Sequence, residues 1–159
     1  MRHVTLLFLL RDDTQEICLA MKKRGFGAGK LNGVGGKVGE GESVEAATVR
    51  EAKEEIGVDI DPKALVAVAE IAFHFDSKPD WDLYCHIFFT RMWAGEPTES
   101  EEMAPEWFDQ GDIPFERMWV DDKYWLPLVL RGDYVKAEFT FTSDGSQIIK
   151  YSLDGAPRV

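Results

Sequence analysis

The sequence predicts an α+β fold in which helices flank a central mixed β-sheet. Two observations support this: the 159 residues contain many short apolar, β-prone runs, and only two segments favour a helix. No internal repeat, low-complexity tract or linker interrupts the chain. A chain of this length buries about 70% of its extended surface on folding, which is enough for one core. We therefore predict a single domain over residues 1–159.

The first half of the chain is expected to form two strands, a glycine-rich loop and a helix. Val4–Leu10 and Ile17–Met21 are apolar and β-prone, and a polar turn between them predicts that the second strand returns along the first. Six glycines within residues 22–37 indicate backbone that packs close to something else. A helix is predicted over Ser43–Ile56, because serine is a good N-cap, three alanines favour the helix and a glycine follows its last residue.

The second half is expected to form further strands and one more helix. Leu65–Phe75 and Trp81–Trp93 are long β-rich runs joined by a polar, hairpin-like connection. Val120–Leu130 predicts the second helix, which Pro127 is expected to shorten or kink. Alternating runs on both sides of Asp144-Gly145 indicate a hairpin. The remaining strands are expected at 106–108, 134–142 and 147–153.

Composition and charge exclude several classes of function. The chain has 18 basic and 29 acidic residues, a formal net charge of −11. Such a surface repels nucleic acid polymers and anionic membranes, so we expect neither as a partner, and a polyanionic substrate would need a local cation. No apolar stretch approaches the ~20 residues of a membrane span. Cys18 and Cys85 could form a disulfide, but two buried free thiols in a reducing cytosol are the better interpretation, so we expect a cytoplasmic protein. We also expect it to be a monomer.

The acidic cluster at residues 40–61 holds the clearest chemical signal, with eight acids and two bases. Glu51 and Glu55 are four residues apart and project from one helix face, where like charges repel by a few tenths of a kcal/mol. Glu54 lies four residues after Arg50 and can pair with it. Oxygen-rich clusters of this kind suit Mg²⁺ or Mn²⁺. The alternative is a solvated acidic helix face.

Two common phosphate motifs do not fit the glycine-rich segment. A P-loop ending at Gly29-Lys30 would need glycine at Arg24 and serine or threonine at Leu31, and no G-x-G-x-x-G frame is present. The string that does fit begins at Gly36 and runs G-x₅-E-x₇-R-E-x-x-E-E-x-G. This string resembles the Nudix box, the signature of hydrolases that act on nucleoside diphosphates linked to another group. Ala52 departs from it, because the family usually has a larger aliphatic residue there.

The flanking segments extend the resemblance along nearly the whole chain. Residues 22–30, 32–37 and 118–127 are similar to the animal-type branch of the family that hydrolyses oxidised purine nucleoside triphosphates such as 8-oxo-dGTP. The resemblance implies a Nudix α/β/α sandwich and metal-dependent hydrolysis to the monophosphate and pyrophosphate. Leu31 stands where tryptophan is expected, and the strand around Tyr84 also differs. These departures bear on base preference and not on the chemistry.

The resemblance implies which residues serve catalysis and the metal. The carboxylates of Glu51 and Glu55 and the carbonyl of Gly36 would bind Mg²⁺, with Mn²⁺ as the other candidate. Glu54 is a further candidate ligand. Glu102 matches a position outside the box that acts as a ligand or as a base that orients water.

The resemblance also implies a substrate pocket for a purine nucleoside triphosphate. Trp119 would stack on the purine, and Lys22 is the candidate triphosphate contact. Composition alone favours core packing for the aromatic residues, but the matched motif reverses that for Trp119. The other implied pocket residues are Phe26 and Phe73 as lining, Asn32, Asp121 and Asp122 at the base edge, and Thr5 and Leu83 nearby.

Two alternatives to this function stay open from the sequence. The first is a Nudix enzyme for another substrate, such as a sugar nucleotide, ADP-ribose or a dinucleoside polyphosphate. The second is a non-catalytic Nudix module that only binds a nucleotide. Such modules usually lose acids from the box, whereas Glu51, Glu54 and Glu55 are all present, which favours an enzyme.

Overall fold

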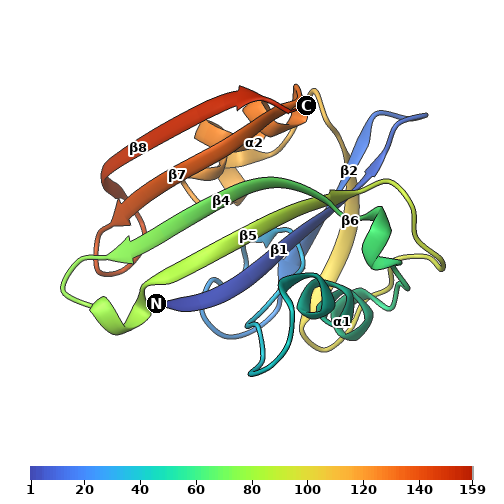
Figure 1. Cartoon of the computed structure of the whole chain (residues 1–159), viewed down its shortest axis with the longest axis horizontal. Coiled ribbons are helices and arrows are strands. Elements are labelled where there is room, and N and C mark those ends of the chain that lie inside the picture. The colour runs from blue at the N-terminus through green and yellow to red at the C-terminus, as the bar shows by residue number, and fades with distance from the viewer. Residues whose placement is uncertain (159) are drawn as a thin grey trace.

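The structure, a computed structural model, describes residues 1–158 and has a mixed sheet between two helices (Figure 1). The strands are β1 (Arg2–Arg11), β2 (Glu16–Lys22), β3 (Leu31–Asn32), β4 (Val66–Phe75), β5 (Leu83–Thr90), β6 (Met103–Asp109), β7 (Asp133–Phe141) and β8 (Ile148–Pro157). The helices are α1 (Val44–Ile56) and α2 (Asp122–Leu130), with short 3-10 helices η1 (Pro62–Ala64), η2 (Pro79–Trp81) and η3 (Phe115–Arg117).

The strands form one sheet in the order β3-β2-β1-β5-β4-β7-β8, and β6 pairs with β2. The β1–β5 and β4–β7 pairs are parallel, and the other pairs are antiparallel, so the predicted mixed sheet is confirmed. β1 pairs with β5 along most of its length but with β2 only through Leu10 and Arg11. The rest of β2 diverges from β1, which leaves space beside the first half of β1.

The glycine-rich segment occupies that space. The Thr5 N–H donates to the Gly36 carbonyl (2.8 Å), and the Leu7 N–H donates to the Val34 carbonyl (2.7 Å). A Cβ on Gly35 would lie 1.8 Å from the Thr5 carbonyl oxygen, so only glycine allows this approach. The prediction that these glycines pack close to another part of the backbone is therefore confirmed.

Alternation along β1 divides the interior into two cores. Phe8 faces the core that contains Trp125 of α2, whereas its neighbour Leu7 faces the core that contains Ala52 and Ile56 of α1. The two helices therefore cover opposite faces of the sheet, as expected for the α/β/α sandwich. Figure 1 shows α1 beside β1 and β6, and α2 behind β7 and β8.

Helix α1 matches its prediction closely. The Ser43 hydroxyl accepts from the Ala46 N–H (3.0 Å), and Gly57 ends the helix with a left-handed φ of 75°. Other elements differ from their predictions, among them α2, β5, β6 and β8, which was predicted over 147–153 but extends from Ile148 to Pro157. Helix α2 begins at Asp122 instead of Val120 and runs through Pro127 to Leu130, because a proline in so short a helix removes only one backbone hydrogen bond.

The predicted strand over 81–93 is too long at both ends. Trp81 belongs to the 3-10 turn η2, and the strand itself is β5. The strand predicted at 106–108 extends to Met103–Asp109, because it pairs with β2 over that whole range. Tertiary pairing, which local composition does not report, sets both boundaries.

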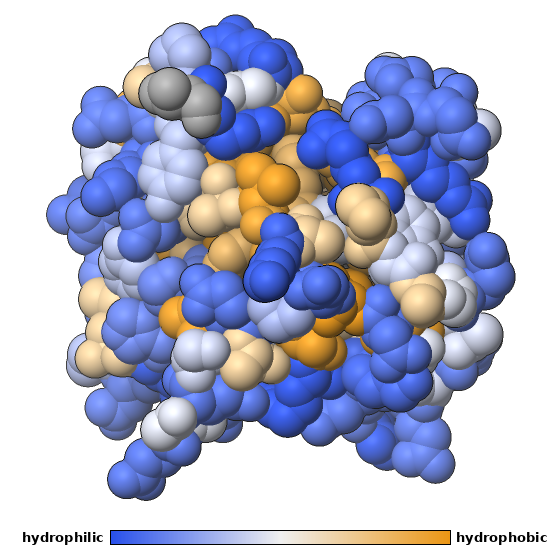
Figure 2. All heavy atoms as spheres, turned by 45° about the vertical axis from the view of Figure 1, so that its right-hand side comes forward, coloured by the Kyte–Doolittle hydropathy of each residue, from blue (hydrophilic) through white to orange (hydrophobic). Residues whose placement is uncertain are grey.

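The hydrophilic surface and the free cysteines are those that the composition predicts. Figure 2 shows a mostly hydrophilic face with apolar residues gathered at its centre. Cys18 and Cys85 are both buried and both free. Within residues 1–158, no helix combines the length and the apolar composition needed to span a membrane.

A histidine links two strands and the turn η2 on the face of the sheet opposite α2. His74 of β4 contacts the Asp82 carboxylate through Nδ1 (2.7 Å) and the Glu138 carboxylate through Nε2 (2.6 Å). The hydrogen bond to Asp82, more than that to Glu138, raises the pKa of His74. Protonated His74 therefore stabilises the folded chain below pH ~6.5, and this contribution is lost as the pH rises through the higher pKa of the folded state.

We predict that His74→Gln destabilises the protein more at pH 6 than at pH 9. The difference between the two pH values should be at most about 1 kcal/mol, because partly exposed ion pairs contribute little. Urea unfolding of both proteins at the two pH values measures it. His3→Gln is the control, because His3 contacts another histidine, His86, instead of a carboxylate. Equal destabilisation by His74→Gln at both pH values would contradict the assignment.

Candidate active site

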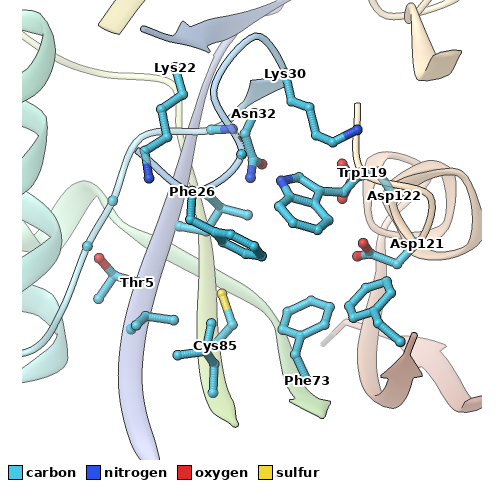
Figure 3. Close-up of a pocket in the computed structure, with 18 of the residues that line it drawn as sticks. Thr5, Lys22, Phe26, Lys30, Asn32, Phe73, Cys85, Trp119, Asp121 and Asp122 are labelled. Atoms are coloured by element: carbon cyan, nitrogen blue, oxygen red, sulfur yellow. Dashed lines mark hydrogen bonds between the residues drawn. The ribbon is translucent and has the colours of Figure 1, made fainter. Parts of the chain in front are cut away.

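A cavity of about 250 Å³ lies where β1, the glycine-rich segment, β4, β5 and the start of α2 meet (Figure 3). Its walls include Gly36 and Glu55 at the end nearest α1. All nine predicted substrate residues line it: Thr5, Lys22, Phe26, Asn32, Phe73, Leu83, Trp119, Asp121 and Asp122. Glu51, Glu54 and Glu102 lie outside the lining.

Aromatic rings form one end of the cavity. The Trp119 ring lies 5.2 Å from the Phe26 ring, and Figure 3 shows both beside the Phe73 ring across the same space. Two glycines fix Trp119, because a Cβ on Gly27 would lie 3.1 Å from its ring and one on Gly145 only 2.8 Å. The indole is therefore packed between the glycine-rich loop and the β7–β8 turn.

Two buried carboxyl groups lie beside these rings. Asp121 and Asp122 are each 2% exposed, and Asp121 accepts from the Trp125 indole N–H (2.8 Å). Asp122 Oδ2 has no hydrogen-bond partner among the described residues. Burial raises the pKa of Asp121 to about 6, and burial together with the charge of Asp121 raises the pKa of Asp122 well above its usual range. The pair therefore retains a proton near neutral pH, so it offers both a donor and acceptors.

Polar groups occupy the middle of the cavity. Thr5 is 3% exposed, and its hydroxyl has no partner among residues 1–158. Figure 3 shows the Lys22 amine on the same side of the cavity as Thr5. Asn32 Oδ1 accepts from the Gly33 N–H (2.8 Å), which fixes the amide against the wall. A ligand that spans the cavity would meet an unpartnered hydroxyl and a cation halfway along it.

Helix α1 supplies the acidic end. Glu55 Oε1 accepts from the Gly35 N–H (2.8 Å), and Glu51 Oε1 accepts from Arg50 (2.9 Å). Burial, and then the charges of Glu51 and Glu102, raise the pKa of Glu55 to about 7, although the Gly35 N–H and Lys22 oppose this. Near neutral pH this carboxyl is therefore partly protonated, because repulsion and desolvation disfavour its charge.

Arginines hold the other acids. Arg50 binds Glu42 at 2.8 Å and reaches Glu54, whose side chain is 58% exposed, at 3.4 Å. Arg24 donates to Glu102 at 2.8 Å. Among the described residues no group of three or more His, Cys, Asp or Glu side chains is arranged to hold a metal ion. The acids are neighbours, but in this structure they bond to arginines and to backbone.

The donor set nevertheless fits a hard divalent cation. Glu55 is half-buried within reach of the charges of Glu51 and Glu102, and a cation among these groups would replace the proton that desolvation favours. The Gly36 backbone lies against Glu51, since a Cβ there would be 2.5 Å from Oε1. Carboxylate and carbonyl oxygens are the ligands that Mg²⁺ and Mn²⁺ prefer.

Sequence reasoning missed several residues of the cavity wall. Cys85 and Phe75 line it, and each is two positions along a strand from a predicted lining residue, Leu83 or Phe73. Strand alternation therefore could have found them. Lys30 places its amine 5.5 Å from the Trp119 ring, and only the tertiary fold reveals that contact.

Known proteins share this architecture. The NUDIX domain family matches residues 1–129. The chain is 45% identical to the oxidized purine nucleoside triphosphate hydrolase of Mus musculus, covering 96% of this chain and 94% of that protein. It is 44% identical to the protein of the same name from Danio rerio, covering 87% and 86%. A MutT protein structure from Bacillus halodurans superposes with a TM-score of 0.83 at 25% identity, covering 97% and 98%. The resemblance in the sequence is thus confirmed, and the chain belongs to the Nudix family of hydrolases.

Proposed function

We propose that this Nudix hydrolase converts oxidised purine nucleoside triphosphates, such as 8-oxo-dGTP, to the monophosphate and pyrophosphate, and so removes them from the nucleotide pool. The observation that supports this most is one continuous cavity with two different ends. Aromatic rings and a proton-sharing aspartate pair form one end, and the acidic helix forms the other. The names of the mouse and zebrafish relatives agree with this substrate.

The aromatic end suits a purine. Trp119 and Phe26 present ring faces and edges for stacking, which contributes to binding beyond the apolar area that is buried. Protonated Asp122 can donate a hydrogen bond while Asp121 accepts one. Together they match a guanine-type edge, which carries both N–H donors and a carbonyl. Movement of the proton between the two would suit a different oxidised purine.

The middle of the cavity suits a sugar and the phosphates that follow it. The Thr5 hydroxyl lies between the aromatic rings and α1, where a nucleotide would place its ribose (Figure 3). Lys22 supplies the local cation that a polyanionic substrate needs on a protein of net charge −11. Its charge also acts on Glu55, which places it near the acidic end.

The acidic end suits hydrolysis at phosphorus. Glu51, Glu55 and the Gly36 carbonyl would hold the divalent cation, Mg²⁺ or Mn²⁺, with Glu54 and Glu102 as further ligands. When bound, such a cation neutralises phosphate charge and lowers the pKa of a water ligand. Arg50 orients Glu51, because Glu42 and the Lys37 carbonyl fix the guanidinium. Glu102, released from Arg24, is the candidate to orient the attacking water and accept its proton.

Hydrolysis of a panel of substrates tests this proposal. With Mg²⁺ present, kcat/KM for 8-oxo-dGTP should exceed that for dGTP, ADP-ribose, a sugar nucleotide and a dinucleoside polyphosphate by ~10-fold or more. Glu55→Gln should lower kcat by at least ~100-fold with the melting temperature kept, because glutamine cannot supply the charge of the half-buried carboxylate. Pyrophosphate release measures both. Preference for ADP-ribose, or undiminished hydrolysis in excess chelator, would contradict the proposal.

The aspartate pair makes a second prediction. Asp121→Asn and Asp122→Asn should change the ratios of kcat/KM among 8-oxo-dGTP, 2-hydroxy-dATP and dGTP by ~10-fold or more, because a buried polar contact to the base is altered. Steady-state kinetics with the three substrates measures the ratios. If the pair only stabilises the N-terminus of α2, kcat/KM will fall by the same factor for all three substrates or will not change for any of them.

A further inference from the structure

Trp81 is an aromatic residue that the sequence analysis did not assign to the site. It lies in η2, the turn between β4 and β5, and its surface is 40% exposed. Trp81 does not line the cavity, but its ring contacts two residues that do. Trp81 belongs to neither hydrophobic core, so burial in a core does not explain its large indole.

The indole packs against residues that do line the cavity. Its ring lies 5.1 Å from the Phe26 ring and 5.8 Å from the Phe75 ring, both edge to face. Phe26 in turn lies 5.2 Å from Trp119. Phe26 therefore sits between two indoles, Trp119 on the cavity side and Trp81 on the other.

Phe26 needs such support. It is 47% exposed and lies between Gly25 and Gly27, whose φ values of +82° and +83° belong to backbone that few other residues adopt. Because glycine has no side chain, the two residues next to Phe26 cannot pack against its ring. Contacts with Trp81, Phe75 and Trp119 fix its orientation.

Trp81 is itself held in place. The Lys78 amine lies 4.0 Å from the centre of its ring, a cation–π contact. The backbone N–H of Trp81 donates to the backbone carbonyl of Lys78 (3.0 Å). The next residue, Asp82, is hydrogen-bonded to His74 of β4. The turn is thus fastened to the sheet on the side away from the cavity.

We propose that Trp81 is a positioning residue that acts through Phe26 to fix the aromatic wall, formed by Phe26 and Trp119, against which the purine stacks. This inference rests on the proposed function. Loss of Trp81 leaves the acidic end unchanged, so it alters purine binding and not the chemical step. One edge-to-face aromatic contact corresponds to a change of about 3- to 10-fold in affinity.

The test compares Trp81→Ala and Trp81→Phe with Tyr151→Ala. Tyr151 is 50% exposed and stacks on Phe139 at 5.3 Å, so its loss removes an exposed aromatic contact that does not involve Phe26. Steady-state kinetics with 8-oxo-dGTP give KM and kcat, and calorimetry gives the Kd of 8-oxo-dGMP without turnover. Melting temperatures of all variants check the fold.

Trp81→Ala should raise KM and the Kd of 8-oxo-dGMP by about 3- to 10-fold with kcat within about twofold, Trp81→Phe should recover most of the loss, and Tyr151→Ala should match the wild type. An unchanged KM and Kd in Trp81→Ala, or an equal effect of Tyr151→Ala, overturns the inference and leaves the proposed function intact. A wild type that hydrolyses no oxidised purine triphosphate overturns both.

Discussion

The contact between the Gly33–Gly36 backbone and β1 is the constraint on which the rest of the site depends. Cβ atoms at Gly33 and Gly35 would lie 2.6 Å and 1.8 Å from carbonyl oxygens of β1, so no side chain is tolerated there. The segment takes the place that β2 would have along the first half of β1, and the cavity opens beside it. Its own N–H and carbonyl groups then connect Glu55 of α1 to Thr5 of β1. The acidic helix and the wall of the substrate pocket are in this way fixed to the same few residues.

Charge is distributed along the cavity to suit a substrate with a neutral base and an anionic tail. Both ends contain carboxyl groups whose pKa is raised by desolvation, the half-buried Glu55 at one end and the buried Asp121–Asp122 pair at the other. Burial has different consequences at the two ends. At the base end, the proton that the aspartate pair retains makes one carboxyl a hydrogen-bond donor. At the acidic end, a bound cation can displace the proton from the Glu55 carboxyl. Lys22 also lines the cavity, and under the proposed function it is the counter-charge for phosphate.

Local sequence was sufficient for the parts of the fold that local chemistry determines. Ser43 and Gly57 marked the two ends of α1, and the spacing of the acids placed Glu51 and Glu55 on one side of it. The nine residues that the family resemblance predicted to bind substrate all line one cavity, which the spacing of residues alone could not have indicated. What escaped prediction depends on tertiary contacts: the divergence of β2 from β1, the pairing of Glu102 with Arg24, and Trp81, which composition assigned to a strand.

The central claim, that the Gly33–Gly36 segment positions the acidic end of the cavity, is tested most directly by Gly36→Ala. The new Cβ would lie 2.5 Å from Glu51 Oε1, the flexible end of a side chain, so the protein should fold while Glu51 is displaced. Calorimetric titration should show Mg²⁺ binding weakened by ~10-fold or more, with kcat lowered and the Kd of 8-oxo-dGMP unchanged. Wild-type affinity for Mg²⁺ together with a wild-type kcat would contradict the claim.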